Sequence, residues 1–110
     1  MSNHKIARIS AQVSRAISEI IANEIRDEIL KSVTITGCVV TKDLSYAKIY
    51  FTSLSKLPKE EIEKELNEAS HFIRGHLSGK VDLRHTPELK FIYDESIEYG
   101  EKIERLLKEI

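Results

Sequence analysis

Three of the four histidines lie in one stretch, residues 68–91, which reads EASHFIRGHLSGKVDLRHTPELKF. They are His71, His76 and His85, and the same stretch carries Arg74, Lys80, Arg84 and Lys90. Imidazole nitrogens can bind a metal ion, and clustered cations can neutralise phosphate. The formal net charge of the chain is −1, so a basic surface would have to come from how the cations are distributed and not from an overall excess of positive charge.

Metal binding by these histidines conflicts with their spacing. Two ligands on one helix face stand at i and i+4, whereas His71 and His76 are five residues apart and point roughly 140° away from each other on a straight helix. Cys38 is the only cysteine, so no paired thiolates supplement the histidines. The sequence predicts no metal site.

Catalytic signatures are also missing. No glycine-rich phosphate loop and no Ser-His-Asp or Cys-His pattern is visible, and the carboxylates of KEEIEKELNE (59–68) are typical of a solvated helix face. A lone cysteine such as Cys38 is more often a small buried side chain than a nucleophile. We therefore predict a non-enzyme without a cofactor; an enzyme with a dispersed site remains the third alternative.

Phosphate neutralisation fits the distribution of charge better. Residues 1–15 contain no acid, and the acidic blocks lie at 59–68 and beyond residue 94. Because charge is sorted along the chain, one face of the folded protein can be basic. Arg74, Lys80, Arg84 and Lys90 straddle a predicted helix end and the entry to a strand, where side chains from neighbouring elements converge.

The elements that position these groups follow from periodicity. Apolar residues at three- and four-residue spacing predict a helix over about 5–29, and a second helix follows Pro58 to about Gly79, with Phe72 in its apolar stripe. Residues 33–41 and 46–53 predict an antiparallel hairpin with a bulge at Gly37; a third strand covers 89–94, and Ser96 can cap a last helix. Phe72 and Phe91 are both expected in the core.

This order, α-β-β-α-β-α, predicts an α+β fold in which helices pack on one face of a three-stranded sheet. With 110 residues, the chain is expected to form one domain, residues 1–110, that folds alone. The amino terminus lacks the apolar core of a secretory signal, and no apolar run approaches the roughly 20 residues that span a bilayer. The expected location is the cytosol.

Several motifs, taken in order, resemble the ribosome-binding factor A family. They are VTIT (33–36), DLSYAKIY (43–50), FIR (72–74), LRHTPELKFIYDES (83–96) and the closing Gly100, Ile103, Leu106 and Leu107. The resemblance implies a KH-like fold of the type II order, α-β-β-α(kink)α-β-α. It also implies a non-enzymatic, cytoplasmic and monomeric protein that binds the small ribosomal subunit and its 16S rRNA, promotes rRNA maturation and supports growth in the cold.

The family has an Ala-x-Gly kink between two short helices, and the matching positions here are Ala69, Ser70 and His71. His71 stands where the family usually has glycine, so either the kink is gentler or His71 is held in it and projects at the binding face. A second departure is Asp27-Glu28-Ile29 in place of Asp-Pro-Arg. Without that proline, the first helix is expected to run on by a turn.

The resulting hypothesis is an RNA-binding surface around the kink and the second half of the helix. Its predicted members are Arg74, Lys80, Arg84, His71 and His85, extended by Lys5, Arg8 and Arg15 of the first helix. Most contacts of this kind go to phosphates and position the protein. The alternative keeps the fold but makes the protein an interaction module that docks a protein partner through its apolar sheet face or acidic helix.

Overall fold

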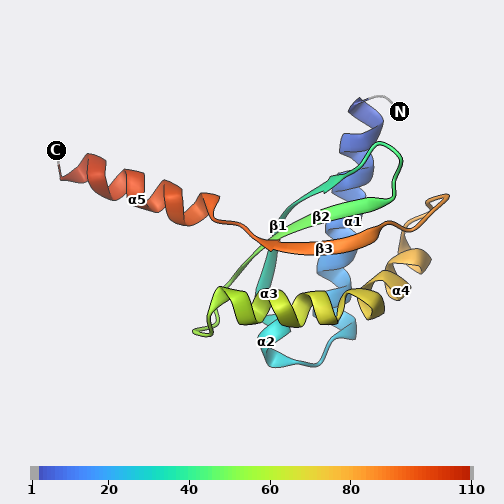
Figure 1. Ribbon diagram of the computed structural model, residues 1–110, viewed down its shortest axis with the longest axis horizontal. Coiled ribbons are helices and arrows are strands. Elements are labelled where there is room, and N and C mark those ends of the chain that lie inside the picture. The colour runs from blue at the N-terminus through green and yellow to red at the C-terminus, as the bar shows by residue number, and fades with distance from the viewer. Residues whose placement is uncertain (1–2, 110) are drawn as a thin grey trace.

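The computed structural model describes residues 3–109, except for the side chains of residues 3 and 97–99. The helices are α1 Asn3–Glu24, α2 Glu28–Lys31, α3 Lys59–Glu68, α4 Ser70–Lys80 and α5 Ser96–Lys108. The strands are β1 Val33–Val40, β2 Tyr46–Ser53 and β3 Glu88–Tyr93. The predicted α+β class and element order are confirmed, and the short α2 is an addition that was not predicted (Figure 1).

The sheet has the order β1-β2-β3, with β1 and β2 antiparallel and β2 and β3 parallel. The register shifts between Ile35 and Gly37, which confirms the predicted bulge beside Gly37. The hairpin turn contains Leu44, whose φ of 63° makes it the one non-glycine residue with positive φ among residues 3–109.

One face of the sheet is the core face. Ala47, Ile49, Phe51 and Phe91 are completely buried there, under α1, which packs on β1, and under α3 and α4, which pack on β3. The opposite face is left open. Helix α5 extends away from the body of the molecule (Figure 1), so the predicted packing of helices on one face holds for α1, α3 and α4 but not for α5.

The prediction that the first helix continues to about residue 29, by an extra turn, is wrong. Helix α1 ends at Glu24, and Asp27 caps the separate α2 by accepting hydrogen bonds from the backbone N–H groups of Ile29 (2.8 Å) and Leu30 (3.2 Å). An aspartate side chain competes for backbone donors and favours a helix start over a helix interior. The single turn of helix α2 places Leu30 in the core.

The break between α3 and α4 falls at Ala69, with φ −84° and ψ −3°. The Ser70 hydroxyl donates to the carbonyl of Asn67 (2.7 Å) across this break. His71 already lies in the first turn of α4 and has no positive φ, so the kink does not require glycine there. Of the two alternatives for His71, the structure agrees with the gentler kink.

Helix α3 also covers the free edge of β3. The Asn67 side chain accepts from Phe91 N–H (3.0 Å) and donates to the Phe91 carbonyl (3.2 Å), while the Glu63 carboxylate accepts from Tyr93 N–H (3.0 Å). These bonds satisfy edge groups that otherwise invite another strand. They also fix the kinked helix pair relative to the sheet, which positions the end of α4.

Candidate nucleic-acid interface

A cavity of about 360 Å³ lies between α4 and the loop that leads into β3; we call it the loop-side cavity. Helix α4 contributes His71, Arg74, Gly75 and Ser78, and the loop contributes Arg84, His85 and Thr86. These helix positions fall on one side of α4 because they are three and four residues apart. The structure therefore brings together His71, Arg74, Arg84 and His85 of the predicted surface.

Arg74 is committed to the protein itself. Its Nε donates to the carbonyls of Thr86 (3.2 Å) and Pro87 (3.1 Å), and its Nη2 donates to Thr86 (2.8 Å). Hydrogen bonds from a charged donor to half-buried carbonyls are stronger than neutral ones. Arg74 thus holds the loop against α4 and positions Arg84 and His85.

Arg84, His85 and His71 are exposed around this cavity. The ion pairs between described side chains join Lys59 to Glu95 and Lys80 to Glu19, and Arg84 has no carboxylate partner among those side chains. A guanidinium without a partner, beside two imidazoles, can donate several hydrogen bonds to a phosphate oxygen. This is the chemistry that an RNA backbone needs.

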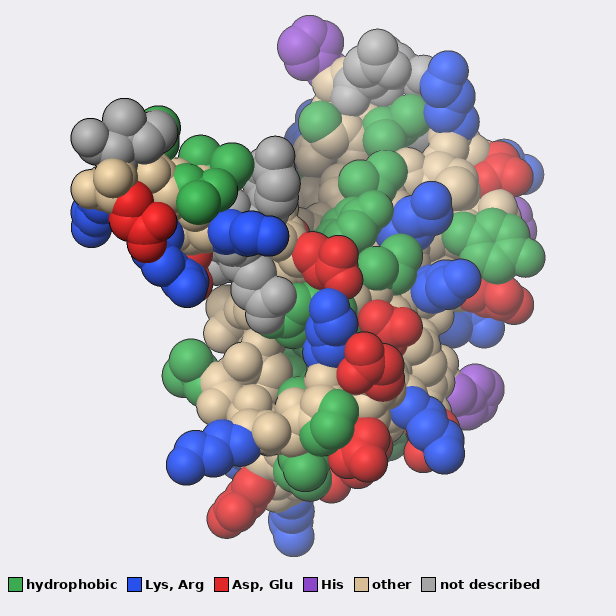
Figure 2. Space-filling model, turned by 60° about the vertical axis from the view of Figure 1, so that its left-hand side comes forward, with side chains coloured by type: hydrophobic (Ala, Val, Ile, Leu, Met, Phe, Trp, Pro, Cys, Tyr) green, Lys and Arg blue, Asp and Glu red, His purple; other side chains and the backbone are tan. Residues whose placement is uncertain are grey.

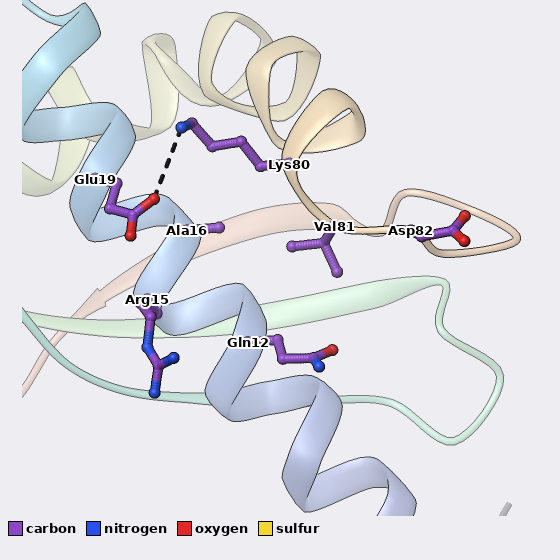
Figure 3. Close-up of a pocket in the computed structure, with 7 residues that line it drawn as sticks. All are labelled: Gln12, Arg15, Ala16, Glu19, Lys80, Val81 and Asp82. Carbon is purple, nitrogen blue, oxygen red and sulfur yellow. Dashed lines mark ion pairs between the residues drawn. The ribbon is translucent and has the colours of Figure 1, made fainter.

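Lys80 lies on the other side of α4. It is nine residues after His71, which turns it roughly 180° around the helix axis. There it lines a second cavity of about 390 Å³, the α1-side cavity, whose other residues are Gln12, Arg15, Ala16, Glu19, Val81 and Asp82. Figure 3 shows Lys80 reaching toward Glu19, with 3.7 Å between Nζ and Oε2, while the Arg15 guanidinium points away from Lys80.

The predicted basic set is therefore divided between two sides of α4. Arg8 and Lys5 line neither cavity, but they lie within about 80° of Arg15 around the axis of α1, since their offsets are seven and ten residues. Both are exposed. They extend the stripe of α1 that borders the α1-side cavity.

The hairpin turn between β1 and β2 was predicted, but sequence reasoning missed that it borders the loop-side cavity. Asp43, Leu44, Ser45 and Tyr46 line a third depression of about 240 Å³ together with Arg74, His85, Thr86 and Glu88. The Ser45 hydroxyl (2.7 Å), the Ser45 N–H (3.1 Å) and the Thr41 hydroxyl (2.8 Å) donate to Asp43 and lower the pKa of its carboxyl to about 2. The Thr-x-Asp-x-Ser spacing is typical of such a turn, but it gives no signal that the turn lies beside the loop into β3.

Phe72 was expected in the core, and that expectation is wrong. Its side chain is 47% exposed, and its ring packs on His76 with centroids 4.6 Å apart, whereas Phe91 is fully buried as expected. The spacing of 72 and 76 places both residues on the margin of the apolar stripe. An exposed ring on α4 is available for stacking.

Cys38 is partly buried against the core, and burial raises the pKa of its thiol to about 12. A thiol that remains protonated is a poor nucleophile. Among the side chains that the structure describes, no group of three His, Cys, Asp or Glu could hold a metal ion.

Comparison with known proteins identifies the family. The model of the family described as ribosome-binding factor A matches residues 5–107. The chain belongs to the ribosome-binding factor A family. Relatives named ribosome-binding factor A include one from Nitrosomonas eutropha, 43% identical over 93% of this chain and 88% of its own length. Another, from Legionella pneumophila (strain Paris), is 43% identical over 100% of this chain and 91% of its own length.

Solved structures agree with this membership. The crystal structure of ribosome-binding factor A from Thermus thermophilus has a TM-score of 0.72 and 26% identity over 80% of this chain and 94% of its own. A second neighbour is the Thermus thermophilus homology model fitted into a cryo-electron-microscopy map of a 30S–ribosome-binding factor A complex. It has a TM-score of 0.68 and 26% identity over 82% of this chain and 96% of its own. In the part of the chain that the structure describes, no helix is long and apolar enough to cross a membrane.

Proposed function

We propose that this protein is a non-enzymatic assembly factor that binds the small ribosomal subunit and its 16S rRNA through the end of α4. The observation that carries this proposal is the loop-side cavity, where Arg84, His85 and His71 stand exposed around a backbone that Arg74 fixes. A preorganised cationic rim can bind phosphates with little loss of conformational freedom on binding. Lys80, Arg15, Arg8 and Lys5 provide further phosphate contacts across α4 and α1.

Family membership supports the partner. A homology model of the Thermus thermophilus relative was fitted into a map of a complex between the 30S subunit and ribosome-binding factor A, and its fold matches this chain. The mixed lining of cations and histidines fits recognition of folded RNA by its shape and backbone. The proposal includes action as a single domain and as a monomer in the cytoplasm.

Co-sedimentation with purified 30S and 50S subunits across a salt series tests the partner. We expect binding to 30S alone, weakening steeply between 50 and 200 mM salt as phosphate contacts dictate, on the order of tenfold or more. Equal pelleting with both subunits, or none with 30S at the lowest salt, would contradict the proposal.

The proposed role in rRNA maturation needs a cellular readout. A strain lacking this protein should accumulate 16S precursor, most visibly in the cold, and a plasmid copy should restore processing. If the wild-type copy restores 16S processing and an Arg84→Gln copy of equal abundance does not, rRNA maturation depends on the loop-side cavity. Normal precursor levels in the deletion strain at low temperature would remove maturation from the proposed function.

One observation favours a second candidate function, the docking of a protein partner. Helix α5 extends from the body with an apolar stripe in which Ile103 is 39%, Leu106 50% and Leu107 64% exposed. Binding through this stripe should be insensitive to salt, in contrast to phosphate contacts. Wild-type binding to 30S that does not change with salt, and that the double variant Leu106→Ser with Leu107→Ser loses, would favour docking over RNA contact.

A further inference from the structure

The open face of the sheet carries a pair of adjacent lysines. On β2, Ala47, Ile49 and Phe51 point into the core, so Tyr46, Lys48 and Tyr50 point to the opposite face. On β3 the same alternation turns Lys90 outward, and the register pairs Lys48 directly with Lys90. Both lysines are exposed.

This pairing is unfavourable for the protein alone. Neighbouring strands are roughly 4.8 Å apart, and like charges directly opposite each other destabilise a sheet. Among the side chains that the structure describes, the ion pairs occupy Lys59 and Lys80, and neither Lys48 nor Lys90 has a carboxylate within ion-pair distance. Glu88 lies on the same face, beside Tyr46, so the three strands carry two cations and one anion there.

Aromatic and apolar side chains flank the two lysines. Tyr46 and Tyr50 stand two residues before and after Lys48, roughly 6.7 Å from it along the strand. Tyr46 is 55% exposed, and Val39 of β1, the partner of Lys48 on its other side, is also 55% exposed. Figure 2 shows Lys or Arg side chains standing next to hydrophobic side chains, a class that includes tyrosine, on the surface beside α5.

We propose that this open sheet face, defined by Tyr46, Lys48, Tyr50 and Lys90, is a binding platform for single-stranded RNA. The lysine pair contacts phosphates, and the tyrosine rings stack on bases. Cations interleaved with aromatic rings on a flat face bind single strands without sequence preference, because every base offers a π-face. A bound phosphate also relieves the repulsion between Lys48 and Lys90. No residue of the platform lines the loop-side or the α1-side cavity, although Tyr46 also lines the depression at the hairpin turn. The platform extends the proposed function to unpaired RNA.

Fluorescence anisotropy with a labelled 12-nucleotide oligouridine tests the platform. The variant is Lys48→Ala with Lys90→Ala, and the matched control is Lys31→Ala with Lys64→Ala, which removes the same charge from exposed lysines off this face. We expect at least a tenfold loss of affinity at low salt for the first variant and less than twofold for the control. The slope of log K against log salt should become shallower by about 1.4, which corresponds to two phosphates on a single strand.

A stability measurement separates this role from a structural one. Removal of two repelling lysines should leave the urea midpoint unchanged or raised, whereas a structural pair would lower it. Tyr50→Leu keeps the apolar bulk and should weaken oligouridine binding severalfold through lost stacking. Equal affinities for the platform variant and its control would overturn the proposal. Equal binding of oligoglutamate in place of oligouridine would also overturn it, because the face would then recognise any flexible polyanion.

The same variants distinguish this proposal from the function proposed above. If the affinity for oligouridine does not depend on Lys48 and Lys90, the platform is ruled out, but 30S binding through Arg84 is not affected. Conversely, a wild-type protein that does not pellet with 30S but binds oligouridine through these lysines would keep the platform and remove the ribosomal partner.

Discussion

The two sides of α4 use their cations differently. On the loop side, Arg74 directs its guanidinium at two backbone carbonyls and leaves Arg84 and His85 exposed. On the α1 side, Lys80 makes a single 3.7 Å ion pair with Glu19. One side is built on a fixed scaffold and the other on a weak surface pair, whose strength salt reduces. The comparison teaches that residue type alone does not separate a cation that holds the fold together from one that stays exposed to solvent.

The largest expected effect is on stability, and it tests whether the two sides of α4 differ. Arg74→Ala should lower the free energy of unfolding by about 2 kcal/mol, because hydrogen bonds from a charged group to partly buried carbonyls are lost. Lys80→Ala should cost less than about 0.5 kcal/mol, as exposed ion pairs do. Urea denaturation measures both. Equal losses would show that the two sides are not distinct.

The next effect concerns binding on the loop side. Arg84→Gln should weaken 30S binding about fivefold, or ~1 kcal/mol, through one lost charged hydrogen bond, with an unchanged urea midpoint. Lys31→Gln, the same charge change on exposed α2, is the control and should bind as wild type. Sedimentation with 30S at fixed salt measures both, and a loss that both variants share would reduce Arg84 to a contribution to net charge.

A smaller effect tests the α1 side with two changes of opposite sign. Glu19→Gln removes the anion beside Lys80 and should raise 30S affinity about twofold, whereas Lys80→Gln should lower it by a similar factor. The two variants are compared in the same sedimentation assay at 50 mM salt. If both leave affinity unchanged, the α1-side cavity faces away from the subunit.

The smallest effect lies in the hairpin turn that borders the loop side. The folded pKa of Asp43, about 2, is below its ordinary value of 3.8, so its stabilisation is present above 3.8 and is lost as the pH falls through about 2. Asp43→Asn should therefore show a shallower loss of urea midpoint between pH 5 and pH 2. A parallel pH profile for the variant and wild type would place the acid sensitivity elsewhere, for example at Asp94, whose pKa is lowered by hydrogen bonds from Ser96 and Thr36.

Sequence patterns predicted what depends on local periodicity. The β-bulge followed from the change of apolar phase at Gly37, and the hairpin followed from alternation around the turn. The end of α1 was missed because an Asp27 cap outweighs a continuing apolar stripe. The core position expected for Phe72 was wrong because this ring lies at the margin of the apolar stripe of α4, whereas RNA binding by Lys80, on the side of α4 that faces α1, stays a prediction.

Other features depend on tertiary structure and have no local signal. The hydrogen bonds of Arg74 require the path of the loop through Thr86 and Pro87, twelve and thirteen residues away. The pairing of Lys48 with Lys90 requires the parallel register of β2 and β3. The family motifs predicted the fold, but which cations are exposed became visible only from these contacts.

Photo-cross-linking tests the central claim, that the loop-side cavity contacts rRNA, most directly. A benzophenone amino acid in place of Ser78, which is exposed and lines this cavity, is irradiated in complex with 30S subunits, with the same residue at Lys64 as the control. We predict cross-links to 16S rRNA from position 78 and none from position 64. Cross-links from 64 alone, or from neither position while the protein still pellets with 30S, would contradict the account.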